Sequence, residues 1–204
     1  MMRVLAWNVG PRPWREILRS LGQLMGEHEA RVTGLFEASN PLLVAALRVR
    51  YPGHRVICRR SDVVALVPRR VARPRVNVIG HDVAWRGPKL GNAKAGRRWL
   101  MLSWDDETIL LVHRVTPIGN VNAWDAETEL LREVAKRWDI ERLAIIGDHN
   151  GTHDRLRPQY ARLGLSLLPV HAKVDHCAVR DFLGGGTRLG NYDSDHVAIL
   201  WRLR

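Results

Sequence analysis

The stretch LAIIGDHNGTH at residues 143–153 places residues that could bind a metal or move a proton directly after an apolar run. Its first four residues read as a buried strand that breaks at Gly147, and Asp148 and Asn150 follow. Gly, Asp and Asn all favour turns, so ordinary turn chemistry is one explanation. The other explanation is that the end of a strand holds a carboxylate and a carboxamide rigidly, as part of a functional site.

Similar polar residues occur where other predicted strands begin or end. A single Asn or Glu at such a place is usually a turn or a cap. Asp175 is a stronger signal, because it interrupts the apolar strand KVDHCAV and an unpaired buried carboxylate is costly. A histidine is its natural partner. The other residues of this kind are Asn8, Glu37, His113, Asp195 and His196.

The elements that must position these side chains are mostly strands. Helical periodicity predicts helices at 13–28, 41–49 and 124–138, and the second begins with Asn40 as cap and Pro41 at its first position. Many strands with few helices indicate two sheets packed face to face with helices outside. The predicted strands cover residues 3–9, 32–37, 54–60, 62–68, 74–80, 98–104, 108–115, 142–147, 173–179 and 196–203.

The length of 204 residues and 46% hydrophobic content suit one domain, spanning residues 1–204. No apolar run reaches the length of a membrane span, and the N-terminus, MMRVLAWNVG, lacks the features of a signal peptide. Cys58 and Cys177 are the only cysteines and fit no zinc spacing. We therefore expect reduced thiols and a cytoplasmic location.

Taken together and in order, these motifs resemble those of the endonuclease/exonuclease/phosphatase (DNase I-like) family. RVLAWNV resembles the family's opening strand, which ends in Asn, and VTGLFE resembles its Glu motif. LLVHRVTP resembles its His motif, AIIGDHN its Gly-Asp-x-Asn motif, and VDH and SDH its two C-terminal motifs. Six motifs in this order span nearly the whole chain. The resemblance implies an α/β fold, a four-layer α/β/β/α sandwich of two mixed β-sheets with helices outside.

The resemblance also implies a divalent-metal site for Mg²⁺ (or Mn²⁺). Carboxylate and carboxamide oxygens are the ligands that such cations prefer, and a cation neutralises an anionic phosphodiester. Glu37 is expected as the principal metal ligand, with Asn8 and Asp195 near it. Asp148 is expected to orient or deprotonate the attacking water, helped by Asn150, which can also bond a phosphate oxygen.

Two histidines complete the implied site. His196 is expected to contact the scissile phosphate, with Asp175 fixing its tautomer and raising its pKa. His113 is expected to bond the phosphate or to protonate the leaving oxygen. Residue types alone do not decide which group is the general base.

The chain departs from the family pattern in several places. His149 stands where an aromatic residue is common, and with His153 it raises the alternative of a metal-binding pair. In an extended segment, however, the two histidines are expected to be solvated or to contact phosphate. DNase I-like members pair the motif histidine with a Glu from the central hairpin, and no such Glu can be placed here. Ser61 or Asp62 lies near that position.

The balance of charge indicates a polyanionic partner. The 32 basic residues exceed the 21 acidic ones, giving a formal net charge of +11. Only four of the 32 are lysines, so 28 are arginines, whose forks match phosphate oxygens. GC-rich arginine codons explain the preference for Arg over Lys, but they do not explain the excess of positive charge. A field of this sign attracts and steers nucleic acid.

One basic, glycine-rich stretch at 84–98 is predicted to be a long loop between strands. An aromatic residue among basic ones suits stacking on a base or following a groove, although a small cluster that anchors the loop is an equal alternative. Arg97 and Arg98 begin the next strand, and either of them could instead reach the scissile phosphate. The predicted nucleic-acid contacts are Trp85, Arg86, Lys89, Lys94, Arg97 and Arg98.

The sequence therefore predicts a divalent-metal-dependent phosphodiesterase that hydrolyses nucleic-acid phosphodiester bonds, a nuclease with DNA favoured. One alternative is a phosphatase or phosphodiesterase acting on a small phosphorylated or lipid substrate. Another is a catalytically silent nucleic-acid-binding module. No amphipathic membrane helix or lipid anchor is evident, so we expect no membrane partner. No obligate protein partner is evident either.

Overall fold

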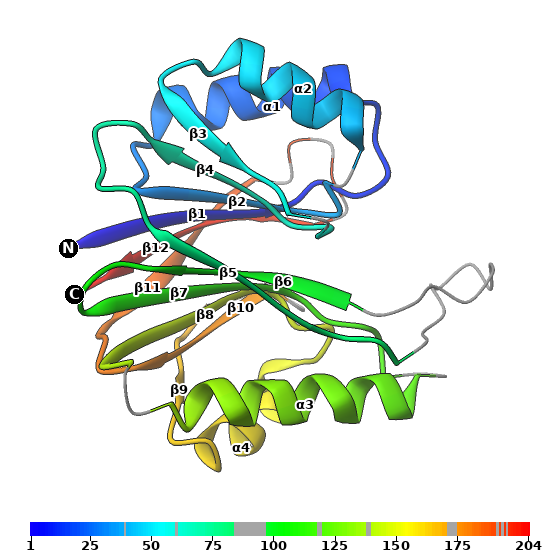
Figure 1. The fold of residues 1–204 in the computed structure, drawn as a ribbon, viewed down its shortest axis with the longest axis vertical. Coiled ribbons are helices and arrows are strands. Elements are labelled where there is room, and N and C mark those ends of the chain that lie inside the picture. Colours follow the sequence, from blue (N-terminus) through cyan, green and yellow to red (C-terminus); the bar gives the residue numbers. More distant parts are fainter. Residues whose placement is uncertain are drawn as a thin grey trace.

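The computed structural model describes residues 1–204 except 39, 60, 84–96, 118–119, 138–139, 171–174, 191, 193 and 195. Two six-stranded sheets lie face to face (Figure 1). The first has the order β11-β12-β1-β2-β4-β3 and the second the order β5-β6-β7-β8-β10-β9. Both are mixed, because β1 and β2 run parallel, as do β7 and β8, while the other neighbours are antiparallel.

The strands of the first sheet are β1 (Met2–Asn8), β2 (Val32–Phe36), β3 (His54–Ile57), β4 (Val64–Pro68), β11 (Gly184–Gly190) and β12 (Ala198–Leu203). Those of the second are β5 (Arg75–His81), β6 (Arg97–Ser103), β7 (Glu107–His113), β8 (Arg142–Asp148), β9 (Ser166–Leu167) and β10 (Asp175–Arg180). Helices α1 (Trp14–Glu27) and α2 (Pro41–Arg50) cover the outer face of the first sheet, and α3 (Val121–Ala135) and α4 (His153–Ala161) cover that of the second. The predicted four-layer sandwich is confirmed.

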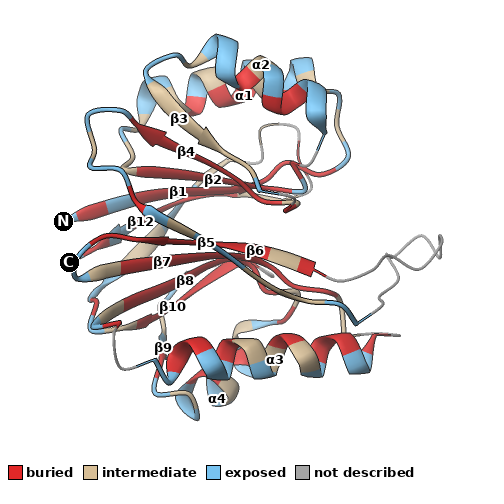
Figure 2. Ribbon diagram, viewed as in Figure 1, coloured by how far each residue is buried: buried red, intermediate tan, exposed pale blue. Residues whose placement is uncertain are grey.

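Apolar side chains fill all three spaces between these layers (Figure 2). The cluster between the two sheets includes Phe36, Leu111 and Trp201. The outer clusters pack each sheet against its helices, which leave their far faces exposed. None of the helices in the described residues is long and apolar enough to cross a membrane.

The helix signals in the sequence are largely confirmed. Asn40 caps α2 by accepting a hydrogen bond at Oδ1 from the backbone N–H of Leu42 (2.9 Å), and Pro41 follows as the first helical residue. α3 begins at Val121, three residues earlier than predicted. Three elements were not predicted, namely α4, the two-residue β9 and the glycine-rich edge strand β11. Glycine is a poor strand former, so the sequence GGGTRLG gives little sign of β11.

The strand directions bring the polar residues to one edge of the sandwich. β1, β2, β7 and β8 all end at this edge, while β10 and β12 begin there. The two chain termini lie at the opposite edge (Figure 1). The sequence-predicted site residues therefore converge because of strand direction, although they are far apart in the chain.

Gly147, the last residue but one of β8, is required by the close approach of β7 to β8. Its φ is +147°, and a Cβ at this position would lie 2.0 Å from the carbonyl oxygen of Val112 and 2.8 Å from the Phe36 ring. We expect Gly147→Ala to lower the free energy of unfolding by about 2–4 kcal/mol, because strain and overpacking both act. Denaturant-induced unfolding measures this loss.

The matched control is Gly26→Ala in α1, where nothing lies within 4 Å of an added Cβ. This substitution should leave stability unchanged or raise it by up to about 1 kcal/mol, because alanine is the better helix former. Equal stability of the two variants would contradict the close packing of β7 against β8.

Candidate active site

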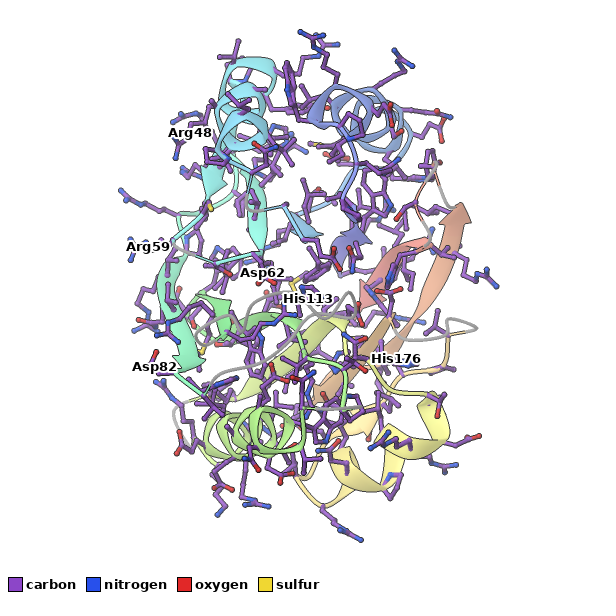
Figure 3. The ribbon with its side chains drawn as sticks, turned by 90° about the vertical axis from the view of Figure 1, so that its right-hand side faces the viewer. Arg48, Arg59, Asp62, Asp82, His113 and His176 are labelled. Carbon is purple, nitrogen blue, oxygen red and sulfur yellow. The ribbon has the colours of Figure 1, made fainter. Side chains whose placement is uncertain are left out.

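Six of the predicted polar side chains meet at this edge. In the second sheet, His113 lies opposite Asp148, and Asp148 lies opposite Asp175 on the next strand. The first sheet supplies the other three. Asn8 is the last residue of β1, Glu37 directly follows β2, and His196 precedes β12. Figure 3 looks onto this part of the molecule, with Asp62 and His113 labelled near its middle.

One oxygen of Asp148 is the common point of the cluster. Asn8 Nδ2, from the other sheet, donates to Asp148 Oδ2 at 3.1 Å. The Nε2 atoms of His113 and His196 each lie 3.8 Å from the same oxygen, which is longer than a hydrogen bond. Two imidazoles therefore face one carboxylate oxygen with a gap on each side.

Asp148 is almost completely buried, with 2% of its surface exposed. Burial raises its pKa, and nearby Asp175 raises it too, while His113 and His196 act in the opposite direction; the net effect is a raised pKa. A buried carboxylate in this position needs hydrogen bonds and positive charge around it. The surrounding side chains supply both.

His196 is paired with Asp175, as the cost of a buried carboxylate in an apolar strand predicted. Nδ1 of His196 lies 2.9 Å from Asp175 Oδ2, so a proton on Nδ1 leaves Nε2 pointing toward Asp148. Ser194 links the backbone of His196 to β1. Its hydroxyl donates to the carbonyl of Asn8 (2.8 Å) and accepts from the backbone N–H of His196 (3.2 Å). β1 thereby helps to position this imidazole.

His113 has an equivalent partner, Asp62, for which the sequence predicts no firm role. Nδ1 of His113 lies 2.7 Å from Asp62 Oδ2, and Arg97 donates to the same oxygen. Arg97 Nη1 also lies 2.7 Å from His113 Nδ1. The carboxylate at the start of the predicted strand at 62–68 was the available signal. Ser61, the alternative considered, instead bonds the carbonyl of Arg98 and the N–H of Val63.

The charges of this group act on one another. Burial, the largest single influence, and Arg97 would lower the pKa of His113, but the carboxylates of Asp62 and Asp148 together give a raised pKa. Burial on its own would raise the pKa of Asp62, but His113 and Arg97 bring it below its usual value. The ion pair thus favours a protonated imidazole beside a negative carboxylate.

Asn150 serves mainly to hold Asp148. Its backbone N–H donates to Asp148 Oδ1 (2.8 Å), in a turn where Asn150 has a φ of +48°. Its side-chain amide donates to the carbonyl of Arg114 (2.6 Å), and the N–H of Arg114 donates to the carbonyl of Asp148 (2.9 Å). Arg114 is fully buried, with its guanidinium 3.6 Å from the centre of the Trp124 ring and Nε 3.6 Å from Glu127 Oε2.

Glu37 is the accessible carboxylate of the cluster. Its side chain is 37% exposed, and Oε1 lies 3.3 Å from Asn8 Nδ2 and 3.5 Å from His113 Nε2. Its φ of +58° is uncommon for a residue with a side chain. Such strain is often retained at functional sites. Here it accompanies a carboxylate at the rim beside the buried one.

The donors present fit a hard divalent cation. Glu37 and Asp148 offer carboxylate oxygens on either side of Asn8, and oxygen ligands suit Mg²⁺ or Mn²⁺. Ligand atoms of Asp148, Asp175 and His196 also lie within 4.8 Å of one another. Asn8 Oδ1 accepts from Gly10 N (3.0 Å), and its Nδ2 faces the two carboxylates. In this orientation Asn8 positions the carboxylates, and its place among the metal ligands stays a prediction.

The remaining predicted residues either lie outside the described part of the chain or make other contacts. Asp195, Trp85, Arg86, Lys89 and Lys94 lie outside the described residues. Arg97 was predicted to contact nucleic acid, but it is only 6% exposed and is held by Asp62, because it enters the sandwich with β6. Arg98 is partly exposed and bonds Asp82 and the carbonyl of His81.

The expectation that His149 is solvated is wrong. This residue is fully buried, its Nδ1 lies 2.5 Å from the Tyr160 hydroxyl, and the two rings meet edge to face. Burial, with His176 and Arg114 nearby, lowers its pKa well below the usual value. A neutral, structural histidine results, because α4 packs Tyr160 against it. His153, at the start of α4, is partly exposed and lies 3.9 Å from Asp154.

Comparison with solved structures defines the fold. An endonuclease/exonuclease/phosphatase family protein from Leptotrichia buccalis aligns at 12% identity with a TM-score of 0.69, and all of both chains is covered. The 3′ phosphatase NExo from Neisseria, bound to product DNA hairpin, gives 16% identity and 0.66, again over all of both chains. D. rerio TDP2 complexed with single strand DNA product gives 12% and 0.67, covering 100% of this chain and 98% of that one.

These likenesses show that the chain has the endonuclease/exonuclease/phosphatase (DNase I-like) fold. No protein-family model matches the sequence, and no curated protein matches it. The roles of individual residues therefore depend on the geometry of this chain.

The His113–Asp62 pair makes a prediction about protonation. In Asp62→Asn the carboxylate that opposes burial and Arg97 is lost, so the pKa of His113 should fall from its raised value. NMR titration of the histidine rings, in EDTA so that no bound metal contributes, measures the shift. Asp82→Asn is the control, because this exposed carboxylate pairs with Arg98 instead. An unchanged His113 pKa in Asp62→Asn would contradict the pairing.

Proposed function

We propose that residues 1–204 form one catalytic domain, a divalent-metal-dependent phosphodiesterase that hydrolyses nucleic-acid phosphodiester bonds, with DNA as the favoured substrate. The observation that carries the proposal is the convergence of Asn8 and of two carboxylate-held imidazoles on a single oxygen of Asp148. Such a group of titratable side chains, built from both sheets, is typical of an active site. A binding module has no need for it.

Glu37 is the principal metal ligand in this proposal, with Asp148 and, as the sequence predicts, Asp195 as further carboxylate ligands. A bound Mg²⁺ or Mn²⁺ neutralises the charge of the phosphodiester and makes its phosphorus easier to attack. Asn8 and Asn150 act by holding the carboxylates in place, through the hydrogen bonds they make to Asp148.

The proton transfers belong to the three groups around Asp148 Oδ2. Asp148 orients the attacking water and accepts its proton, since its Oδ2 faces both imidazoles across gaps of 3.8 Å. His196 donates from Nε2 to a phosphate oxygen while Asp175 holds its Nδ1. His113, held in the same way by Asp62, donates to the phosphate or to the leaving oxygen.

The substrate is proposed from charge. A net charge of +11 attracts polyanions, and most of the positively charged side chains are arginines. Two of the structures with this fold were determined with DNA, the NExo and TDP2 complexes. NExo is named as a 3′ phosphatase, so a phosphatase acting on a phosphorylated nucleic-acid end is the second candidate. Internally labelled and 3′-phosphorylated oligonucleotides distinguish the two activities by their products.

Metal dependence is tested with Glu37→Gln. The amide keeps the shape of the side chain but loses its charge, so Mg²⁺-dependent hydrolysis of an oligonucleotide and of bis(p-nitrophenyl) phosphate should fall by about 100-fold or more. Calorimetric titration should show weaker Mg²⁺ binding by the same variant. The control is Glu29→Gln, which neutralises an exposed carboxylate paired with Arg70. Full activity of the wild type in EDTA would exclude this mechanism.

The His196–Asp175 pair is tested by a double-mutant cycle. His196→Ala and Asp175→Asn should each lower kcat by about 10²–10⁴-fold. The first variant lacks the imidazole, and the second lacks the carboxylate that holds the tautomer of the imidazole. The double variant should be little worse than the poorer single variant, since residues that act as one unit are not additive. Losses that multiply would show that the two residues act independently.

A further inference from the structure

A concave surface lies along one flank of the sandwich, and we call it the arginine hollow. Its volume is about 540 Å³. Its floor is formed by apolar or weakly polar side chains of β3 and β5, among them Val56, Ile57 and Val76. Its basic lining consists of Arg48, His54, Arg55, Arg59, Arg69 and Arg73.

The positive charge of the arginine hollow is not balanced by acidic side chains. No Asp or Glu lines it, and no described carboxylate forms an ion pair with any of its five arginines. Other arginines in the described part of the chain do pair with carboxylates, as Arg70 does with Glu29 and Arg142 with Glu107. Concentrated, unpaired positive charge in a concavity favours an anionic ligand.

Part of this lining is fixed in place by the backbone. Arg55 donates to the carbonyls of Pro68 (3.2 Å), Arg69 (3.1 Å) and Val71 (2.9 Å). Its guanidinium is therefore held rigidly beneath the more exposed arginines. A preorganised charge loses less conformational entropy on binding than a free surface side chain.

One end of the arginine hollow, at Arg59, lies near the proposed catalytic centre. β3 and β5 are the outermost strands of their sheets, so the hollow spans one flank of the sandwich. Arg59 precedes Asp62, the partner of His113, by three residues, which limits their separation to roughly 11 Å. Figure 3 shows Arg48 and Arg59 toward one flank, with Asp62 and His113 nearer the middle.

We propose that the arginine hollow binds the phosphates of a nucleic-acid strand on one side of the scissile bond, an inference that rests on the proposed function. A strand carries one phosphate for about every 3.4 Å of helix axis, so the Arg59 end of the hollow is only a few nucleotides from the reacting phosphate. Guanidinium groups match phosphate oxygens, and the apolar floor suits the sugar or base between them. Five arginines exceed what a single small phosphate can engage.

The test is the salt dependence of binding to a fluorescein-labelled 15-nucleotide single-stranded DNA, measured by anisotropy in EDTA. Arg48→Gln/Arg73→Gln removes two exposed charges that donate no hydrogen bond to a described residue. If both contact phosphates, the slope of log K against log salt should flatten by about 1.4 units. The affinity of this variant for the DNA in low salt should also be lower than that of the wild type.

The matched control is Arg157→Gln/Arg162→Gln, which removes the same charge from exposed positions in and just after α4. The control should change the slope by less than half as much. Equal slopes for the two variants would overturn the proposal, because diffuse charge would then explain binding. If the first variant does not fold by circular dichroism, Arg73→Gln alone should flatten the slope by about 0.7 units against Arg157→Gln.

Hydrolysis of bis(p-nitrophenyl) phosphate separates this inference from the proposed function. Both double variants should retain wild-type Mg²⁺-dependent hydrolysis, since neither touches the catalytic cluster. Wild-type protein that shows the selective slope change but no hydrolysis would contradict the proposed function and leave the hollow standing. Hydrolysis with equal slopes would contradict the hollow and leave the function standing.

Discussion

The hydrogen bond from Asn8 to Asp148 is the contact on which the site depends, because it joins the two sheets at the edge where their functional strands end. Asp148 is buried, so its charge is tolerated only while neighbouring groups stabilise it. Asn8, His113 and His196 face one of its oxygens, and Asn150 donates to the other. The position of the first sheet relative to the second therefore sets the geometry of the whole cluster.

Further contacts, centred on Arg114, hold the Asp148 carboxylate in position. Arg114 bonds the backbone of Asp148 and anchors the amide of Asn150. Its own buried charge lies against Trp124 and Glu127, and Glu127 also accepts hydrogen bonds from the N–H of Val115. Both oxygens of Glu127 are used, so α3 fixes the segment that follows β7. Removing one partner of such a buried pair leaves an unpaired charge in the core and is strongly destabilising.

The sequence was sufficient for the parts of the site that follow from strand patterns and from the cost of burying charge. Asp175 in an apolar strand required a partner, and His196 is that partner. The roles of Asp62 and Arg97 could not be predicted in this way, because their contact with His113 depends on how β4 and β6 face each other across the sandwich. The burial of His149 depends on α4, whose weak amphipathic pattern gave no clear helix signal. The arginine hollow could not be predicted from the sequence either, because β3 and β5 belong to different sheets and only the packing of the sheets brings them together.

The most direct test of the central claim is anomalous diffraction from crystals of the protein soaked in Mn²⁺, which shows where a divalent cation binds. The account predicts a Mn²⁺ ion in direct contact with the carboxylate of Glu37, at the edge where Asp148 and the two imidazoles converge. The same peak should be absent from crystals of Glu37→Gln. Mn²⁺ bound only elsewhere, or unchanged binding in that variant, would contradict the claim that this edge is a metal-dependent phosphodiesterase centre.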